Sequence, residues 1–187
     1  MTDLSIDYNG KEIKAAYLEW YAKAKTEGFN GIPGWVVKMD ALLDSQLIDP
    51  LQNFCALYAF TQKVSSHNRS SMGSDDSESA VKFSKSLIVI PEGKSYTKIL
   101  EAESRRIRIQ ELTIRKLKNL NDGITVQKEF IYYNAYIDHS EVIAGTELAL
   151  LFSFDRLRIV ENIFSEEGKK TGLMAYEVEV YSGKISA

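Results

Sequence analysis

The sequence contains few of the side chains from which catalytic and metal sites are usually built. It has one cysteine, Cys55, and two histidines, His67 and His139, among 187 residues. A single cysteine excludes an internal disulfide framework, so the fold is not built for an oxidising compartment. Cys55 lies in the apolar run NFCALYAF and is expected to be a small buried side chain, not a catalytic thiol. His67 lies in a polar stretch without a second ligand at metal-binding spacing.

The chain also lacks an excess of positive charge and any long apolar run. Its 23 Lys and Arg residues stand against 26 Asp and Glu, and the sequence pI is about 5.5. This balance does not favour a nucleic acid or an anionic membrane as a partner. No stretch approaches the ~20 apolar residues of a membrane span. The opening residues MTDLSIDYNGKEIK do not resemble a signal peptide, so we expect a cytoplasmic protein.

The common catalytic motifs are missing as well. There is neither a glycine-rich phosphate loop nor a G-x-S-x-G nucleophile elbow. Asp138 and His139 could form a base with its orienting carboxylate, but neighbouring strand residues point to opposite faces and would not meet. Asp75, Asp76 and Glu78 do not have the spacing of a calcium loop, which favours a solvated acidic loop. We therefore predict no catalytic residue, no cofactor and no metal site, and no enzyme activity.

The first part of the chain carries the pattern of an amphipathic helix. Residues 11–28 place six apolar side chains at helical spacing among lysines and glutamates: Ile13, Ala16, Tyr17, Trp20, Tyr21 and Ala24. Gly28 is expected to end this helix, and residues 29–34 form a loop. An aromatic stripe is typical of a docking face, against the main body or a neighbouring subunit. We expect residues 1–30 to be a helical extension and residues 31–187 to be the main domain.

The main domain is predicted to be largely β. In chain order, the expected elements are a strand or short helix at 35–43, a strand at 51–64, a long polar loop at 65–79, a strand at 81–90, a short helix at 95–105, and strands at 107–117, 126–137, 148–154, 157–159 and 174–180. The helix is expected to bury one stripe made of Tyr96, Ile99, Leu100 and Glu103. Asn121-Asp122-Gly123 predicts a tight hairpin turn between two of the strands.

The strand at 107–117 changes phase halfway. Ile107 and Ile109 alternate in one phase, whereas Leu112 and Ile114 alternate in the other. The change at residues 110–111 predicts a β-bulge, which would bend the strand as a closed barrel requires. We therefore expect a small antiparallel β-barrel with one short internal helix.

The stretch EFIYYNAYIDHSE, residues 129–141, has apolar side chains in both phases. One face of the expected strand carries Val126, Phe130, Tyr132, Asn134 and Tyr136, and the other carries Ile131, Tyr133, Ala135 and Ile137. A small antiparallel barrel fills its inside with such side chains but normally leaves its outside wet. Apolar side chains on both faces therefore predict a further layer, which is either the N-terminal helix or a second subunit.

Several of these segments resemble, in the same order, the haemolysin-coregulated protein (Hcp) family, the tube subunits of the bacterial type VI secretion system. SAVKFSKSLIV followed by SYTKILEAE resembles its strand and helix, and RIRIQELTIRKLKN followed by ITVQKEFIYYNAYIDHSEV resembles a pair of its strands. LALLFSFDRLRI resembles another of its strands, and GKKTGLMAYEVEVYSGKIS resembles its last strand. The resemblance runs from about residue 47 to the C-terminus. The helix before GFNGIPGW and the segment FCALYAFTQKV depart from the family pattern.

The resemblance implies a structural role. Such proteins are small β-barrels that form hexameric rings, and the rings stack into a tube that a contractile sheath propels into a target cell. The implied partners are copies of the chain, the sheath, the spike and effector proteins, and the apparatus itself would export the protein without a signal peptide. The loop at 65–79 would reach a neighbouring subunit or ring.

Three other functions stay open at this point. One is a phage-type tail tube protein, which shares the architecture. The second is a monomeric or dimeric β-barrel binding module, such as an adaptor or an immunity protein. The third is an enzyme that uses Cys55 or His139.

Overall fold

The computed structural model describes the main domain apart from several loops. The described residues are 34–40, 42–43, 51, 53–62, 64–67, 80–83, 85–120, 123–143, 147–180 and 185–186. The predicted N-terminal helix at 11–28, nearly all of the following loop, and residues 68–79 of the predicted polar loop lie outside them.

The described residues form a mainly antiparallel β structure with one short helix, which confirms that part of the fold prediction. In chain order the elements are β1 (Trp35–Met39), β2 (Cys55–Ala56), β3 (Ala59–Thr61), β4 (Val64–His67), β5 (Ala80–Phe83), β6 (Ser86–Pro91), α2 (Tyr96–Ser104), β7 (Ile109–Leu120), β8 (Gly123–Ile143), β9 (Glu147–Ser153), β10 (Arg156–Phe164), β11 (Lys170–Glu179) and β12 (Ile185–Ser186). The two longest strands, β7 and β8, are joined by the predicted tight turn, since Leu120 pairs with Gly123.

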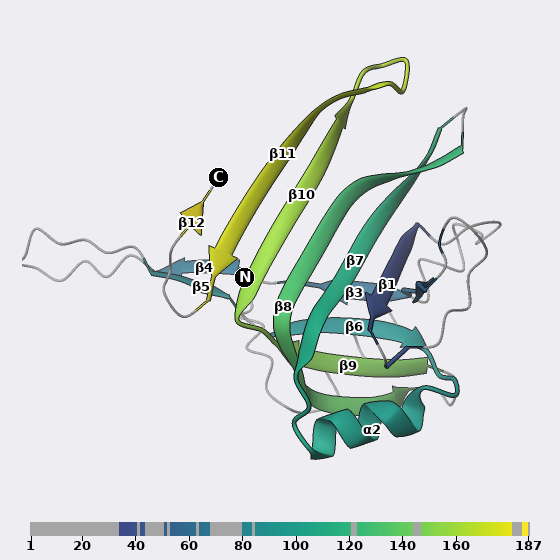
Figure 1. Cartoon of the computed structure of the whole chain (residues 1–187), viewed down its shortest axis with the longest axis vertical. Coiled ribbons are helices and arrows are strands. Elements are labelled where there is room, and N and C mark those ends of the chain that lie inside the picture. Colours follow the sequence, from purple (N-terminus) through teal and green to yellow (C-terminus); the bar gives the residue numbers. More distant parts are fainter. Residues whose placement is uncertain are drawn as a thin grey trace, which may run out of the picture.

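The strands are arranged in two parts that share β8. One part has the strand order β12-β11-β10-β8-β7-β1-β2. In the other part, the second half of β8 pairs with β9, β9 pairs with β6, and β6 pairs with β3. Strands β4 and β5 pair only with each other in the described chain. In Figure 1, β7, β8, β10 and β11 run steeply, β3, β6 and β9 cross them at a wide angle, and α2 lies at the lower end.

Among the described strands, no continuous ladder of strand pairs closes the two parts into a barrel. Strand β2 pairs with β1, and β3 pairs with β6. The chain passes from one to the other through two residues, Leu57 and Tyr58. The N–H of Leu57 donates to Trp35 O at 3.1 Å, and that of Tyr58 donates to Val89 O at 2.8 Å. These two bonds bridge the edges of the two parts.

Three neighbouring strands bend at the same level, where the two parts meet. Strand β8 pairs with β10 up to Tyr133 and with β9 from Tyr136 onward. Between them, Asn134 has a left-handed backbone with φ of 53°, and asparagine tolerates this conformation better than most residues. Opposite this point β9 ends and β10 begins, with the N–H of Asp155 donating to Tyr133 O at 3.1 Å. The level therefore marks a corner of the molecule.

The corner explains the phase changes and corrects two expectations. Ile109, Leu112 and Ile114 are all buried, which confirms the phase change in β7. The register shift between β7 and β8, however, falls between Lys116 and Leu117 and not at residues 110–111. Ile107 lies before the strand, so its side chain does not continue the alternation.

The same corner changes the faces of β8. Ala135 and Ile137 are buried together with Phe130 and Tyr132, although alternation predicts them on opposite faces. The prediction was wrong because a left-handed residue at position 134 shifts the alternation by one residue. Tyr136 is therefore turned away from the core and is only half-buried.

Other boundaries differ from the sequence prediction. The expected strand at 51–64 is divided into β2, β3 and the start of β4, because the chain changes partners at Leu57 and Tyr58. The expected strand at 81–90 is two strands, β5 and β6, in different sheets. The polar loop begins later than predicted, because β4 extends to His67. In α2 the buried residues are Ile99 and Ala102, whereas Leu100 is 40% exposed.

The core lies between the two parts and is centred on Tyr132. This side chain is fully buried, and its ring makes edge contacts with Phe152 and Phe154 at centroid distances of 5.0 and 4.8 Å. Its hydroxyl donates a 2.7 Å hydrogen bond to Gln62 Oε1, which also accepts one from Ser86. A buried tyrosine hydroxyl requires such a partner. Burial raises the pKa of Tyr132, so the hydroxyl is neutral.

Candidate interaction surfaces

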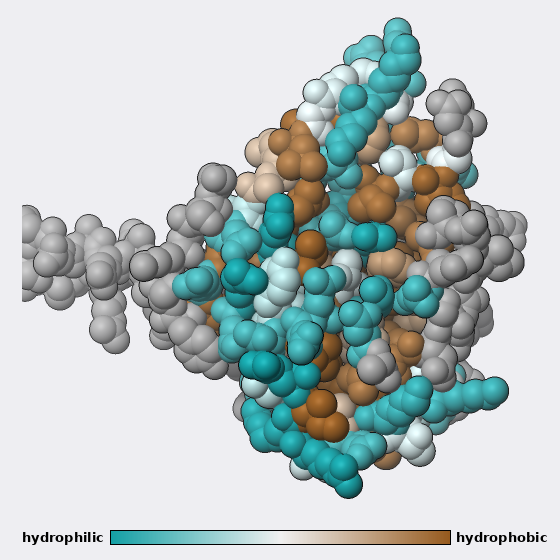
Figure 2. All heavy atoms as spheres, in the orientation of Figure 1, coloured by the Kyte–Doolittle hydropathy of each residue, from teal (hydrophilic) through white to brown (hydrophobic). Residues whose placement is uncertain are grey.

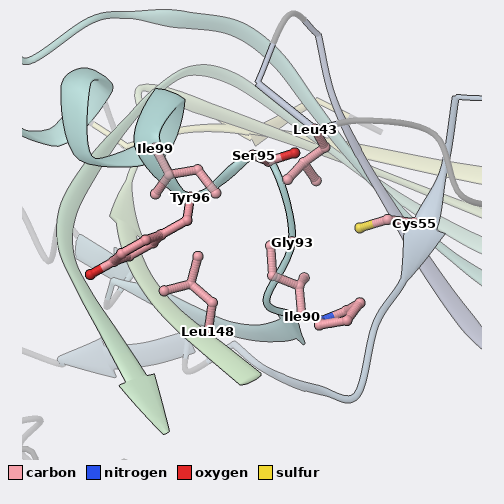
Figure 3. Close-up of a pocket in the computed structure, with 9 residues that line it drawn as sticks. Leu43, Cys55, Ile90, Gly93, Ser95, Tyr96, Ile99 and Leu148 are labelled. Carbon is pink, nitrogen blue, oxygen red and sulfur yellow. The ribbon is translucent and has the colours of Figure 1, made fainter. Parts of the chain in front are cut away.

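Cys55 lies in the wall of a small apolar pocket below α2. Figure 3 shows its side chain on one side of the pocket near Ile90 of β6, with Ile99 of α2 and Leu148 of β9 on the other side. Only 4% of Cys55 is exposed, and burial raises its pKa from 9.0 to about 12. The protonated thiol is a poor nucleophile. This geometry agrees with the expectation of a small buried side chain.

Asp138 and His139 have separate partners, although β8 does not alternate regularly here, because its register with β9 shifts between Ile137 and His139. The Asp138 carboxylate is 3.3 Å from Lys85 Nζ and 3.9 Å from an Arg106 guanidinium nitrogen. Nδ1 of His139 lies 3.8 Å from the carboxylate of Glu103 in α2. The contacts to Arg106 and Glu103 connect β8 to the C-terminal end of α2 and the residues after it, and the contact to Lys85 connects β8 to the residue before β6. None of these contacts pairs Asp138 with His139.

No other group of the described residues suggests a reaction site. Three or more His, Cys, Asp and Glu side chains do not come together there in a metal-binding arrangement. Asp75, Asp76 and Glu78, the residues weighed as calcium ligands, lie outside the described residues. In the described part of the chain, no helix is both long and apolar enough to cross a membrane.

The sheet formed by β7, β8, β10 and β11 has a charged face away from the core. Arg115 and Glu129 form an ion pair at 2.5 Å across β7 and β8. On β10, the Arg156 guanidinium lies 4.1 Å from the centre of the Tyr133 ring and also pairs with Glu177 at 3.2 Å. Tyr133 is therefore half-buried by side chains of its own chain. Figure 2 shows the polar atoms over the middle of this face.

The end of the β10–β11 hairpin is the most apolar exposed feature of the described chain. Its two strands project well beyond the core in Figure 1. Ile163, Leu173 and Met174 have 43, 54 and 64% of their surface exposed. Leu173 and Met174 are consecutive strand residues, and so they point to opposite faces. We call these three side chains the ribbon patch. Figure 2 shows apolar atoms over β10 and β11 on one of the two faces.

The alternating segment of β11 is buried at one end only. In the sequence, Met174, Tyr176, Val178 and Val180 alternate with Glu177 and Glu179, which predicts a half-exposed strand with one apolar face. Val178 is 1% exposed, Tyr176 is half-buried, and Met174 is largely exposed. The gradient follows the strand as it leaves the core, because Val178 pairs with Leu157 at the corner while Met174 pairs with Glu161 in the projecting part. Residue type alone does not reveal where a strand leaves the core.

Comparison with known sequences finds no relative. No family model and no curated protein sequence matches the chain. The likeness reported next is therefore a likeness of fold.

Solved structures that match this fold include proteins named for type VI secretion. A protein described as a type six secretion system protein matches with a TM-score of 0.70 and 10% identity, over 81% of this chain and 98% of that one. A type VI secretion system effector from Yersinia pestis matches with a TM-score of 0.62 and 12% identity, over 78% and 99%. Hcp1 from Salmonella typhimurium matches with a TM-score of 0.62 and 9% identity, over 81% and 97%. The chain has the fold of Hcp proteins, as a divergent example with about a fifth of its length unmatched.

Proposed function

We propose that this chain is a structural subunit that assembles into hexameric rings, and that the rings stack to form the inner tube of a type VI secretion apparatus. The observation that carries the proposal is the fold match, which spans nearly the full length of Hcp1 and of two proteins named for that system. The family resemblance in the sequence points to the same role. The proposed partners are further copies of the chain, the sheath, the spike and effector proteins.

The ribbon patch supports self-assembly. Three large apolar side chains project from the body on a two-stranded hairpin. Burying one such side chain contributes roughly 1.5–3 kcal/mol, so a contact on either face of the hairpin is worth a few kcal/mol before the cost of association. In a closed ring every copy makes the same contact, because cyclic symmetry repeats it. A ring of six would bury the patch six times.

The described titratable groups fit a structural role. Cys55 is a buried neutral thiol, and Asp138 and His139 each connect β8 to other elements. In the proposed function each subunit acts through its contact surfaces, the ring acts through its central opening, and the protein carries out no reaction. It would leave the cell through the apparatus that it builds.

Electron microscopy of the purified full chain, together with light scattering, tests the proposal. We expect rings with a central hole and a mass near six subunits. Leu173→Lys combined with Met174→Lys should shift the protein to smaller species, because lysine cannot be buried at an apolar contact without a large cost.

Leu100→Lys is the matched control, since Leu100 is also an exposed apolar residue but lies on α2. It adds the same kind of charge and should leave the rings intact. A stable monomer of the unmodified chain at high concentration would overturn the tube function and favour a monomeric binding module. Rings that survive the two ribbon substitutions would retain the function but remove the ribbon patch from the contact.

A further inference from the structure

A second apolar cluster lies on the outer face of β6 and β9, on the side opposite the core. It consists of Leu87 and Val89 from β6, Ala149 and Leu151 from β9, and Ile143 at the end of β8. These residues are only 1–7% exposed. We call them the outer patch.

The outer patch is unusual for an antiparallel sheet. Its residues alternate with Ile88, Ile90, Leu148 and Leu150, which are buried in the main core. Both faces of β6 and β9 are therefore shielded from water, whereas an antiparallel sheet commonly leaves one face solvated. Within the described part of the chain, the partly buried apolar side chains packed on the patch are Tyr58 and Ala59. Two residues at one margin are too few to cover two strands, so side chains outside this part of the chain must complete the cover.

The sequence leaves one stretch that can supply this layer. Among the residues outside the described structure, 68–79 read NRSSMGSDDSES and contain a single large apolar side chain. Residues 44–50 would form a helix of only about 10 Å with two large apolar side chains, Leu47 and Ile48, and residues 144–146 and 181–184 are shorter still. Residues 11–28, in contrast, carry six apolar side chains on one helical face, including Tyr17, Trp20 and Tyr21.

The chain also enters the described structure at a suitable place. Trp35 begins β1, and its ring lies 5.8 Å from that of Phe60 in β3. Strand β3 pairs directly with β6, which carries Leu87 and Val89 of the outer patch. Residues 29–34 can extend over roughly 20 Å, and a helix of 18 residues is about 27 Å long. Neighbouring strands are about 4.8 Å apart, so the helix can span β6 and β9 easily.

We propose that residues 11–28 form a helix that docks on the outer patch of the same copy of the chain. The inference is independent of the tube function. About a fifth of the chain has no counterpart in the matched Hcp-fold structures, although those structures are covered almost completely. This share is close to that of residues 1–33. In this proposal residues 11–28 and the outer patch form one unit, in which the helix covers the face.

The two tryptophans of the chain, Trp20 and Trp35, make the proposal testable. Trp35→Phe leaves Trp20 as the single fluorescent reporter in the segment. We expect a blue-shifted emission that is protected from acrylamide quenching. Adding Leu151→Lys should shift the emission to that of the denatured chain, because the charge cannot be buried under the helix. Adding Leu173→Lys is the control, since it places the same charge on the ribbon patch and should leave Trp20 unchanged.

Circular dichroism shows whether the Leu151→Lys protein keeps its β structure. If it does not, deletion of residues 1–30 replaces it, and the β signal should remain while binding of an apolar dye increases. Trp20 emission that is solvent-exposed already in the Trp35→Phe protein would overturn the proposal. So would emission unaffected by Leu151→Lys in a folded protein, or dye binding unaffected by the deletion.

A further measurement separates docking within one copy from docking onto a neighbour. A fluorescent acceptor is attached at Glu141→Cys, which pairs with Ala149 beside the patch, in a Cys55→Ala background. Energy transfer from Trp20 should persist when the labelled Trp35→Phe protein is denatured and refolded with a large excess of unlabelled chain. Loss of the transfer under these conditions would show that the helix binds a second copy, and would overturn docking within the chain.

Discussion

Two consecutive tyrosines, Tyr132 and Tyr133, should respond very differently to the same substitution. Tyr132 is fully buried between Phe152 and Phe154, so Tyr132→Ala should cost roughly 3–5 kcal/mol from the lost ring and the cavity left behind. Tyr132→Phe keeps the ring and loses the bond to Gln62, which should cost about 1 kcal/mol. Tyr133→Ala removes a half-buried ring under Arg156, a contact worth about 0.5–1 kcal/mol, and should cost about 1–2 kcal/mol in total.

Urea unfolding followed by far-ultraviolet circular dichroism measures these differences. All variants are compared at one protein concentration, because assembly adds to the apparent stability. The midpoint should fall in the order wild type, Tyr132→Phe, Tyr133→Ala, Tyr132→Ala, with the slope unchanged. The separation between the two alanine variants is the critical quantity. Equal losses at positions 132 and 133 would refute the assignment of Tyr132 to the core and of Tyr133 to the charged face.

Two further predictions concern single positions. Burial raises the pKa of Cys55 from 9.0 to about 12, so the neutral thiol favours the folded state fully below pH 9, and this stabilisation is lost as the pH rises toward 12. In unfolding measured as a function of pH, the wild type should therefore lose up to about 4 kcal/mol more than Cys55→Ala over this range. Steeper loss in the alanine variant would contradict the burial of the thiol. At the left-handed position 134, Asn134→Val should destabilise by about 1–3 kcal/mol whereas Asn134→Gly should be nearly neutral in thermal unfolding, and equal losses would argue against the corner geometry.

Much of the fold follows from local patterns in the sequence. The tight turn before Gly123, the helix after Ser95 and the strand class of most segments depend on nearest neighbours and alternation, and these predictions were confirmed. The phase changes in the strands were also visible. Their cause was not, because a bend that involves three strands arises from pairing between residues far apart in sequence.

The surfaces were harder to predict than the elements. Apolar residues at positions 131 and 133 suggested a dry outer face, but Arg156 from β10 lies over Tyr133, and sequence alone does not show that contact. Leu100 was expected in the buried stripe of α2 and Met174 on the apolar face of its strand, and both side chains are exposed. Alternation predicts which residues share a face, whereas burial depends on what lies opposite that face.

The continuity of strand β8 has a consequence for how the protein unfolds. It is a single strand of 21 residues, and it pairs with β7, β9 and β10 across both parts of the molecule. Because β8 runs without interruption through both parts, neither part can unfold without breaking the strand pairing of β8 that the other part shares. Melting should therefore be all-or-none for the two parts, with one calorimetric transition for the whole β body.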